Sequence, residues 1–217
     1  PLVVERDTIV KTGTSTALNP EWVWMATRAD RNQIGLVQWD VAPFAAAVAE
    51  LADVNVVGIA PIATLTLYTK PNRVGNIVSV HRLANDFPSC CWTHNDGSKN
   101  ITGQVYDELS GVDIAADTPL DTWEFTAARD AISTWFDIQL NVTLDSATRA
   151  AIADPDGHGK LGFVLSTSES NDCFYVSRDH NWGHRSPSLA PRLTVYAEIG
   201  TASPSSAPIP APTVIPG

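Results

Sequence analysis

Two histidines, His180 and His184, have the spacing of a possible zinc site. An HxxxH pair binds zinc when a helix stacks the two imidazoles on one face and a third ligand completes the site. Asn181, Gly183 and Pro187 lie within or just after the pair and disfavour a helix there. We therefore interpret the pair as part of a surface loop and expect no metal-dependent hydrolysis from it.

A second group of possible ligands lies in the segment DPDGHGK, residues 154–160. Asp154 and Asp156 resemble two carboxylates of an oxygen-ligand calcium loop, although the later acidic ligand of an EF-hand is missing. The alternative is a tight turn that leads into the apolar run after it. A structural calcium ion at these two residues is the cofactor that the sequence suggests.

The chain has three cysteines, Cys90, Cys91 and Cys173, and no CxxC pair, so a zinc ribbon is not expected. Neighbouring cysteines rarely bond to each other because the resulting ring is strained. We expect Cys173 to pair with Cys90 or Cys91 in an oxidising compartment; the alternative is three reduced, buried thiols. Cys91 and His94 are also close in sequence, but they lie in a turn-prone loop, which we interpret as held by the disulfide.

Aromatic residues suggest a different chemistry, because the apolar faces of Trp and Tyr rings stack on sugar rings. Seven tryptophans are many for a chain of 217 residues. Our candidates for a carbohydrate site are Trp22, Trp24, Trp92, Tyr175 and Trp182. The alternative for each ring is packing: we expect Trp39 to face the core, and Trp123 or Trp135 to cover a sheet.

Most of the segments that must position these residues alternate between apolar and polar residues. In ATLTLYT, Ala63, Leu65 and Leu67 are expected to face the core, and Tyr68 to face outward. GKLGFVLS is apolar on both faces, which is typical of a central strand. The other expected strands are RDTIVKTG, EWVWMATR, IGLVQWDV, NIVSVHRL, TWFDIQLNV, CFYVSR and PRLTVYAEI. This pattern predicts an all-β, antiparallel jelly-roll β-sandwich.

Two segments read as short helical inserts in this sandwich. Residues 42–54 are rich in alanine and have Pro43 near their start. Residues 144–154 have Asp145 or Ser146 as a possible N-cap and end at Pro155. Strands do not alternate regularly with helices, so a parallel α/β sheet is not expected.

The end of the chain divides it into a domain and a tail. In PRLTVYAEI we expect Leu193, Val195, Ala197 and Ile199 to face the core, so that this strand closes a sandwich over residues 1–199. Residues 200–217 are uncharged, rich in Pro, Ser and Ala, and unable to build a core. Such a tail is either a linker or a segment that packs against a neighbouring subunit.

Charge and missing motifs exclude several functions. The net charge of −10 argues against binding to duplex nucleic acid or to anionic membranes. No apolar run is long enough to cross a bilayer, so no membrane insertion is expected. We find no Ser-His-Asp order, Gly-rich phosphate loop or credibly spaced carboxylate pair, and expect no catalysis. The acidic charge is compatible with a soluble extracellular protein, with calcium-rich media or simply with solubility.

The order of these segments over residues 5–199 resembles the DNRLRE (disaggregatase-related) domain family. The positions that carry the resemblance are Asp7-Thr8, Trp39-Asp40, 63–68, 78–83, Trp92, 136–143, Ser177-Arg178-Asp179 and 191–196. The resemblance implies a jelly-roll β-sandwich of secreted or surface proteins. Related domains are attached to polysaccharide-active enzymes, and some are classed as carbohydrate-binding modules; the family is not known for catalysis of its own.

Two functions follow as expectations. The first is a non-catalytic structural or adhesive surface module, which could be the subunit of an extracellular filament that assembles through the tail or by strand addition of PLVVERDTIV. The alternative is a polysaccharide-binding module tethered to an enzyme or a surface anchor. The alternative predicts a cluster of two or more solvent-facing aromatic rings on one sheet face or loop rim.

Overall fold

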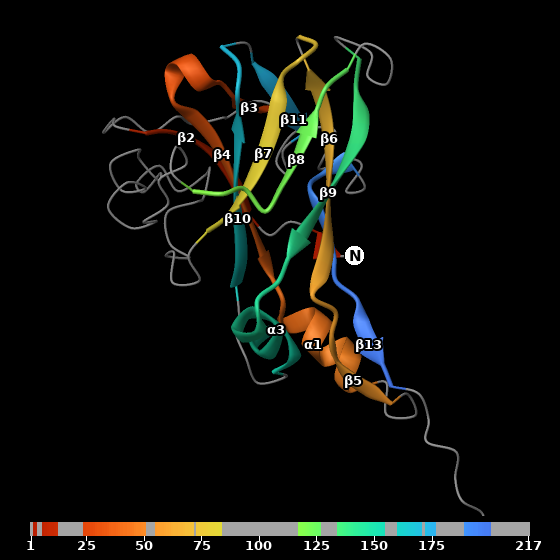
Figure 1. Ribbon diagram of the computed structural model, residues 1–217. Helices are drawn as coiled ribbons and strands as arrows, with labels where there is room; N and C mark the ends of the chain where they lie inside the picture. The colour runs from red at the N-terminus through yellow and green to blue at the C-terminus, as the bar shows by residue number, and fades with distance from the viewer. Residues whose placement is uncertain are drawn as a thin grey trace, which may run out of the picture.

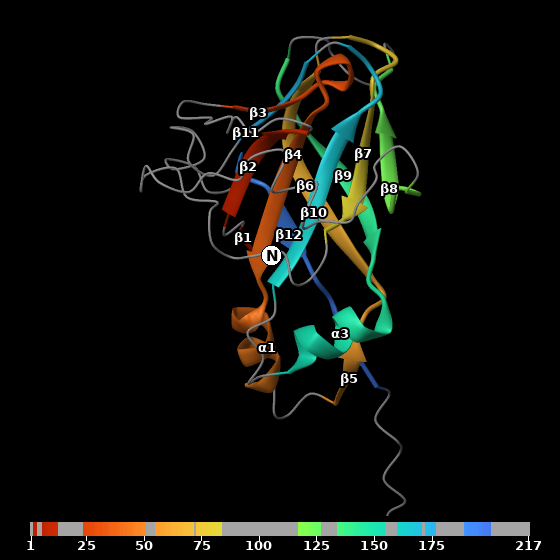
Figure 2. The ribbon, with the colours of Figure 1, turned by 90° about the vertical axis from the view of Figure 1, so that its left-hand side faces the viewer.

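Antiparallel β-strands dominate this protein, whose computed structural model describes residues 2–3, 6–12, 24–50, 55–71, 73–83, 117–126, 134–154, 160–170, 172–176 and 189–200. Most of the strands form two sheets, a six-stranded sheet A and a five-stranded sheet B, which pack face to face around a shared core (Figure 1). Helices α1 (Ala42–Ala49) and α3 (Ser146–Ala153) and a ribbon of β5 (Val56–Ile59) and β13 (Ala197–Ile199) lie beyond one end of the sheets (Figure 2). The predicted all-β, antiparallel sandwich is confirmed.

Sheet A is built around a long strand, β6. Its strands are β1 (Leu2–Val3), β3 (Trp24–Thr27), β6 (Ile62–Pro71), β9 (Phe136–Thr143), β11 (Cys173–Val176) and β12 (Arg192–Thr194). One edge of β6 pairs with β9, and the other edge is shared by β12 and β11, which pair with successive parts of it. β1 continues the sheet beside β12, and β3 continues it beside β11.

Sheet B has β10 at its centre. Its strands, in spatial order, are β2 (Arg6–Lys11), β4 (Gln33–Asp40), β10 (Lys160–Thr167), β7 (Ile77–Arg82) and β8 (Asp121–Glu124). Every pairing among them is antiparallel. From Leu161 to Thr167 every residue of β10 is buried, which confirms the predicted central strand that is covered on both faces.

The chain crosses repeatedly between the two sheets. It passes from β3 in sheet A to β4 in sheet B, then to β6 in sheet A and β7 in sheet B. Neighbours within a sheet are therefore often distant in sequence, as with β4 beside β10 and β6 beside β11. Connections of this kind are typical of a jelly roll.

The core lies between the sheets and is formed by one residue in two along the strands. Ala63, Leu65 and Leu67 of β6 are fully buried, as their spacing predicts. Trp39 of β4 is also fully buried and meets the ring of Phe163 edge to face, with ring centroids 5.9 Å apart. The predicted inward position of Trp39 is therefore confirmed.

Both predicted helical inserts are present at one end of the sandwich. α1 begins at Ala42 with a proline in its first turn. α3 is capped by Asp145, whose carboxylate accepts a hydrogen bond of 2.7 Å from the backbone N–H of Thr148, so Asp145 rather than Ser146 is the N-cap. A short 3-10 helix, η1 (Ala29–Arg31), precedes β4. None of the described helices is long and apolar enough to span a bilayer.

The prediction of one strand over PRLTVYAEI is wrong in its second half. Leu193 and Val195 are buried against the core, but Ile199 is 68% exposed. The pattern breaks because β12 and β13 have different partners: β12 pairs with β6, and β13 pairs with β5 beyond the start of β6. The β5–β13 ribbon packs against α3 and not between the two sheets, so the alternate residues of β13 do not face the core of the sandwich.

The two ends of the chain differ in what the structure describes. β1 and β2 both pair within the chain, with β12 and β4, so the first strands are used in the protein's own sheets. The predicted tail begins at Gly200, whose backbone N–H donates to the carbonyl of Asn55 at 2.7 Å. Residues 201–217 lie outside the described residues, and so does any test of the division at residue 199.

Candidate functional site

Polar and aromatic side chains cover the side of sheet A that faces away from the core. Successive strand residues point to opposite faces, and cross-strand partners share a face. We call this surface the β6 face; its residues are Thr64, Thr66, Tyr68, Trp135, Asp137, Gln139, Asn141, Arg192, Thr194 and Tyr196. The polar members on β9 are all exposed, while its alternate residues are buried.

At one end of the β6 face two aromatic rings are stacked on each other. The ring centroids of Tyr68 and Trp135 are 5.6 Å apart, and the ring planes are inclined by 20°. Both side chains are partly exposed. Trp135 immediately precedes β9, and the pairing of β9 with β6 brings it beside Tyr68. The stack fixes the orientation of both rings before any ligand arrives.

A third aromatic ring lies toward the other end of the face. Tyr196 is 48% exposed, and its hydroxyl is 3.4 Å from Oγ1 of Thr64. Thr64 and Tyr68 are four residues apart on β6, which corresponds to about 13 Å at ~3.3 Å per strand residue. The face therefore has aromatic rings near both ends of this line.

Hydrogen-bonding groups lie between the aromatic ends. The guanidinium of Arg192 is 3.2 Å from the carboxylate of Asp137, and both side chains are partly open to solvent. Gln139 and Asn141 are exposed on β9 and add amide donors and acceptors. Paired charges and amides of this kind can exchange hydrogen bonds with the hydroxyl groups of a ligand.

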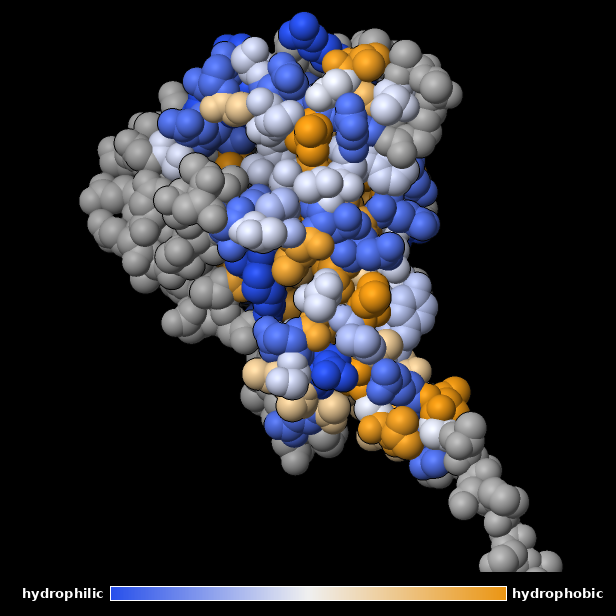
Figure 3. Space-filling model, in the orientation of Figure 1, coloured by the Kyte–Doolittle hydropathy of each residue, from blue (hydrophilic) through white to orange (hydrophobic). Residues whose placement is uncertain are grey.

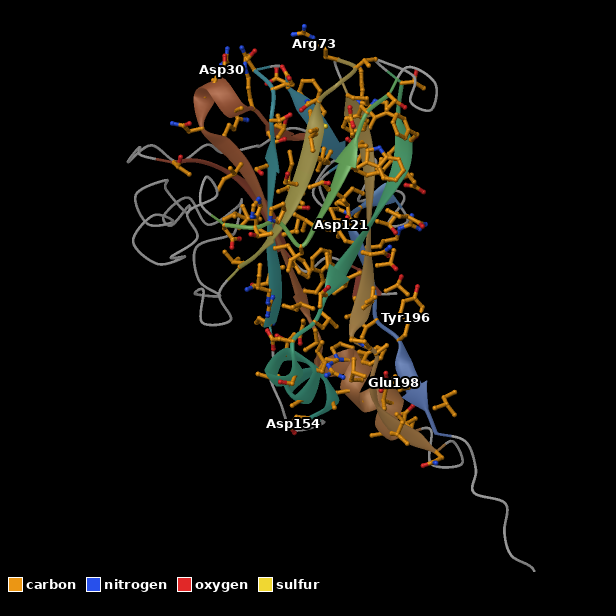
Figure 4. All side chains as sticks on the ribbon, viewed as in Figure 1. Asp30, Arg73, Asp121, Asp154, Tyr196 and Glu198 are labelled. Atoms are coloured by element: carbon orange, nitrogen blue, oxygen red, sulfur yellow. The ribbon has the colours of Figure 1, made fainter. Side chains whose placement is uncertain are left out.

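A hydrogen bond joins β9, which carries the exposed polar residues of the β6 face, to β8 of sheet B. The backbone N–H of Asn141 donates to Oδ2 of Asp121 on β8 at 2.6 Å, while Oδ1 of Asp121 accepts from Thr122 N–H at 2.8 Å. Figure 4 shows Asp121 on the side where the two sheets meet and Tyr196 at the outer side of sheet A.

A hydrogen-bonded row of Ser, His and Asp side chains, which we did not predict from the sequence, lies on the outward side of sheet B. Oγ of Ser166 is 3.4 Å from Nε2 of His81, whose Nδ1 is 3.0 Å from Oδ2 of Asp117. Ser166 and His81 are both buried, and each is the last residue but one of its strand. The N–H groups of β10 are used in ladders with β4 and β7, which leaves no oxyanion site on that strand. We interpret the hydrogen bonds that connect Ser166, His81 and Asp117 as structural.

The predicted aromatic site is not assembled by the described residues. Tyr175 is fully buried, and its hydroxyl is 3.2 Å from Oγ1 of Thr27, so it cannot stack on a ligand. Burial also raises the pKa of Tyr175 well above its usual value. Trp24 begins β3, but its side chain is outside the described part, as are Trp22, Trp92 and Trp182. A role for these four tryptophans stays a prediction.

Cys173 does not carry the predicted disulfide in this structure. It is a free, fully buried thiol on β11, 3.4 Å from Oγ1 of Thr69. Burial raises its pKa to about 11, so the reactive thiolate is scarce at neutral pH. Cys90 and Cys91 lie outside the described residues.

The predicted metal sites are not tested by the described residues. Asp154 is exposed at the end of α3, at the opposite end of the molecule from Asp30 and Arg73 (Figure 4). Asp156 lies outside the described residues, as do His180 and His184. Within the described ranges, no three His, Cys, Asp or Glu side chains gather as a metal site would require. Calcium binding at Asp154 and Asp156 stays a prediction.

Sequence reasoning therefore missed most of the β6 face. It predicted that Tyr68 faces outward and that Trp123 or Trp135 covers a sheet, but it did not join the rings of Tyr68 and Trp135. They lie in segments that only the pairing of β6 with β9 brings together. The local signal was the polar half of TWFDIQLNV, where Asp137, Gln139 and Asn141 alternate with core residues.

Comparison with known proteins adds little to this geometry. No protein-family model matches the chain, and no curated protein matches it. The chain is similar to the C-terminal CBM6 of LamC, a marine laminarinase from Zobellia galactanivorans, at 7% identity and a TM-score of 0.27. The match covers 79% of this chain and 99% of that one. We draw no argument from so low a TM-score, and membership of the DNRLRE family stays a prediction.

Proposed function

We propose that this protein is a non-catalytic module that binds a polysaccharide on the β6 face. The observation that carries the proposal is the stacked pair of Tyr68 and Trp135 on an exposed sheet face, with Tyr196 on the same face. A cluster of solvent-facing aromatic rings is what a carbohydrate-binding module requires and what a purely structural sandwich does not.

The chemistry of the face suits a sugar chain. The C–H side of a pyranose ring is apolar and packs on an aromatic ring, while its hydroxyl groups remain free for hydrogen bonds. Arg192 and Asp137 supply a charged donor and a charged acceptor beside the stacked rings. Gln139 and Asn141 extend the polar strip along β9. Apolar ring contacts would supply affinity and the polar groups would set orientation.

The direct test is binding of the purified protein to a panel of polysaccharides, by affinity electrophoresis and calorimetry. We expect at least one soluble polysaccharide to bind the wild type, and Trp135→Ala to weaken that binding about tenfold or more. Val57→Ala is the matched control, because Val57 is an exposed apolar residue on β5 and away from the face. Equal loss in both variants, or binding that survives Trp135→Ala, would rule out this face.

We propose the same setting that the sequence suggests. The module would act outside the cell, and residues 200–217 would link it to an enzyme or a surface anchor. Its relation to the DNRLRE family belongs to the same proposal. Recovery of the protein from the culture medium or the cell surface is the expected result; purely intracellular protein would contradict this setting.

One observation favours self-association as a second function. Val57 and Ile199 on the β5–β13 ribbon are 62% and 68% exposed, and orange atoms at the lower right of Figure 3 mark apolar side chains there. No described strand pairs with the outer edges of this ribbon, so a second copy could add to it. Sedimentation velocity across a range of concentrations should show association that Val57→Asp abolishes; a monomer throughout would exclude it.

A further inference from the structure

We infer that the β6 face takes a neutral, linear glycan that lies along β6 and contacts an aromatic group near each end. This inference rests on the proposed glycan-binding function and names its ligand class.

The aromatic rings define the direction of the ligand. Tyr68 and its partner Trp135 lie at one end, and Tyr196 contacts Thr64 at the other. These ends are about 13 Å apart along the strand at ~3.3 Å per residue. A single sugar ring is too short to touch both, whereas a short run of linked units can do so.

The rows that cross the face lack this arrangement. The central row runs from Arg192 through Thr66 to Gln139, and all three side chains are polar. The next row joins Thr194, Thr64 and Asn141 and is polar as well. A glycan lying across the strands would meet aromatic rings at one end at most, so only the direction along β6 uses both groups.

The charges favour a neutral chain over an acidic one. Arg192 is already paired with Asp137, which cancels the central positive charge. Lys70 lies two residues after Tyr68 on β6, and Glu198 on β13 lies two residues after Tyr196. One end of the face is therefore flanked by a positive charge and the other end by a negative charge. The whole protein carries −10 and would repel a polyanion at a distance. A repeating uronate or sulfate would lack matching cations here.

The experiment is calorimetric titration with neutral linear oligosaccharides of increasing length, cut from the best neutral polysaccharide of the panel. We expect affinity to rise at least tenfold once the oligomer is long enough to reach both aromatic groups. Trp135→Ala and Tyr196→Ala should each abolish that rise, while the shortest binding oligomers should respond to only one of the two. A polyuronate and a sulfated glycan should show no binding at low or high salt.

Controls separate this inference from the proposed function. Thermal melting and near-ultraviolet circular dichroism establish that each variant is folded, and the exposed Gln139→Ala offers a milder change on the same face. If the wild type binds an acidic glycan and Trp135→Ala abolishes that binding, the inference of a neutral ligand is wrong and the proposed function still holds. Affinity independent of length, or unaffected by Tyr196→Ala, would overturn the two-ended contact. If no glycan of either charge binds, the proposed function itself fails.

Discussion

The outward faces of sheets A and B are used in opposite ways. On sheet B the outward residues of the central strands are buried, including Leu36, Val164 and His81. On sheet A the outward residues of β9 are exposed, and aromatic rings lie among them. Among the described residues, exposed aromatic and hydrogen-bonding side chains therefore gather on the outward side of sheet A, whereas the outward residues of the central strands of sheet B are buried.

The largest expected effect is a difference in stability between two variants, each of which carries a new carboxylate on the outward face of one sheet. Val164→Asp puts a carboxylate where the side chain is fully buried, and we expect a loss of about 4 kcal/mol or more in the free energy of unfolding. Gln139→Asp puts it on the exposed face and should change that free energy by less than about 0.5 kcal/mol. Urea denaturation measures both; similar costs would erase the contrast between the faces.

The next effect concerns binding rather than stability. Trp135→Ala removes one ring of the stacked pair, and we expect the binding free energy of a neutral glycan to fall by about 2 kcal/mol. Because Trp135 is only partly buried, its loss should destabilise the fold by no more than about 1 kcal/mol. Calorimetry and urea denaturation of one preparation provide both values. A large stability loss with unchanged affinity would make the stack a packing feature.

A smaller effect is expected at the helical end, which belongs to neither face. Asp145→Ala removes the N-cap of α3 and should cost about 1 kcal/mol without changing glycan binding. The hydrogen bond from Thr148 N–H lowers the pKa of Asp145. The cap therefore stabilises fully above the usual carboxyl pKa and loses this contribution as pH falls through the lowered value. Unfolding curves of both proteins should converge in acid; a difference that grows in acid would contradict this.

The smallest effect should be that of the exposed ion pair on the β6 face. Asp137→Asn keeps a side-chain acceptor and removes the charge opposite Arg192, so we expect less than about 0.5 kcal/mol of destabilisation. Glu198→Gln, which changes an exposed carboxylate on β13, is the matched control. Melting temperatures at low and high salt measure the difference. A loss well above the control, and one that salt abolishes, would show that the pair stabilises the fold.

Much of the fold could be predicted because the two sheets leave different local patterns. FDIQLNVT alternates and becomes the half-exposed β9, whereas KLGFVLST has apolar residues on both faces and becomes the central β10. The strand ending at Ile199 was mispredicted because alternation continues while the partner strand changes. The periodicity of a strand shows which of its residues share a face, but it does not show which other strand pairs with it.

The candidate site was harder to predict because it depends on register. Tyr68 and Asp137 face each other only through the pairing of β6 with β9, and Arg192 joins them through β12. Tyr175, chosen for its residue type, lies on the inward side of β11 and is fully buried. Residue type alone does not separate a core aromatic ring from a binding one; the face on which it lies does.

We propose that a glycan binds the outward face of sheet A and not that of sheet B. Backbone amide chemical shifts, recorded while a neutral linear oligosaccharide is added, test it most directly. We expect the shifts of β6, β9 and residues 192–196 to change and those of β4 and β10 to stay unchanged. Changes centred on β4 and β10 or on the β5–β13 ribbon, or none with any glycan in the panel, would contradict it.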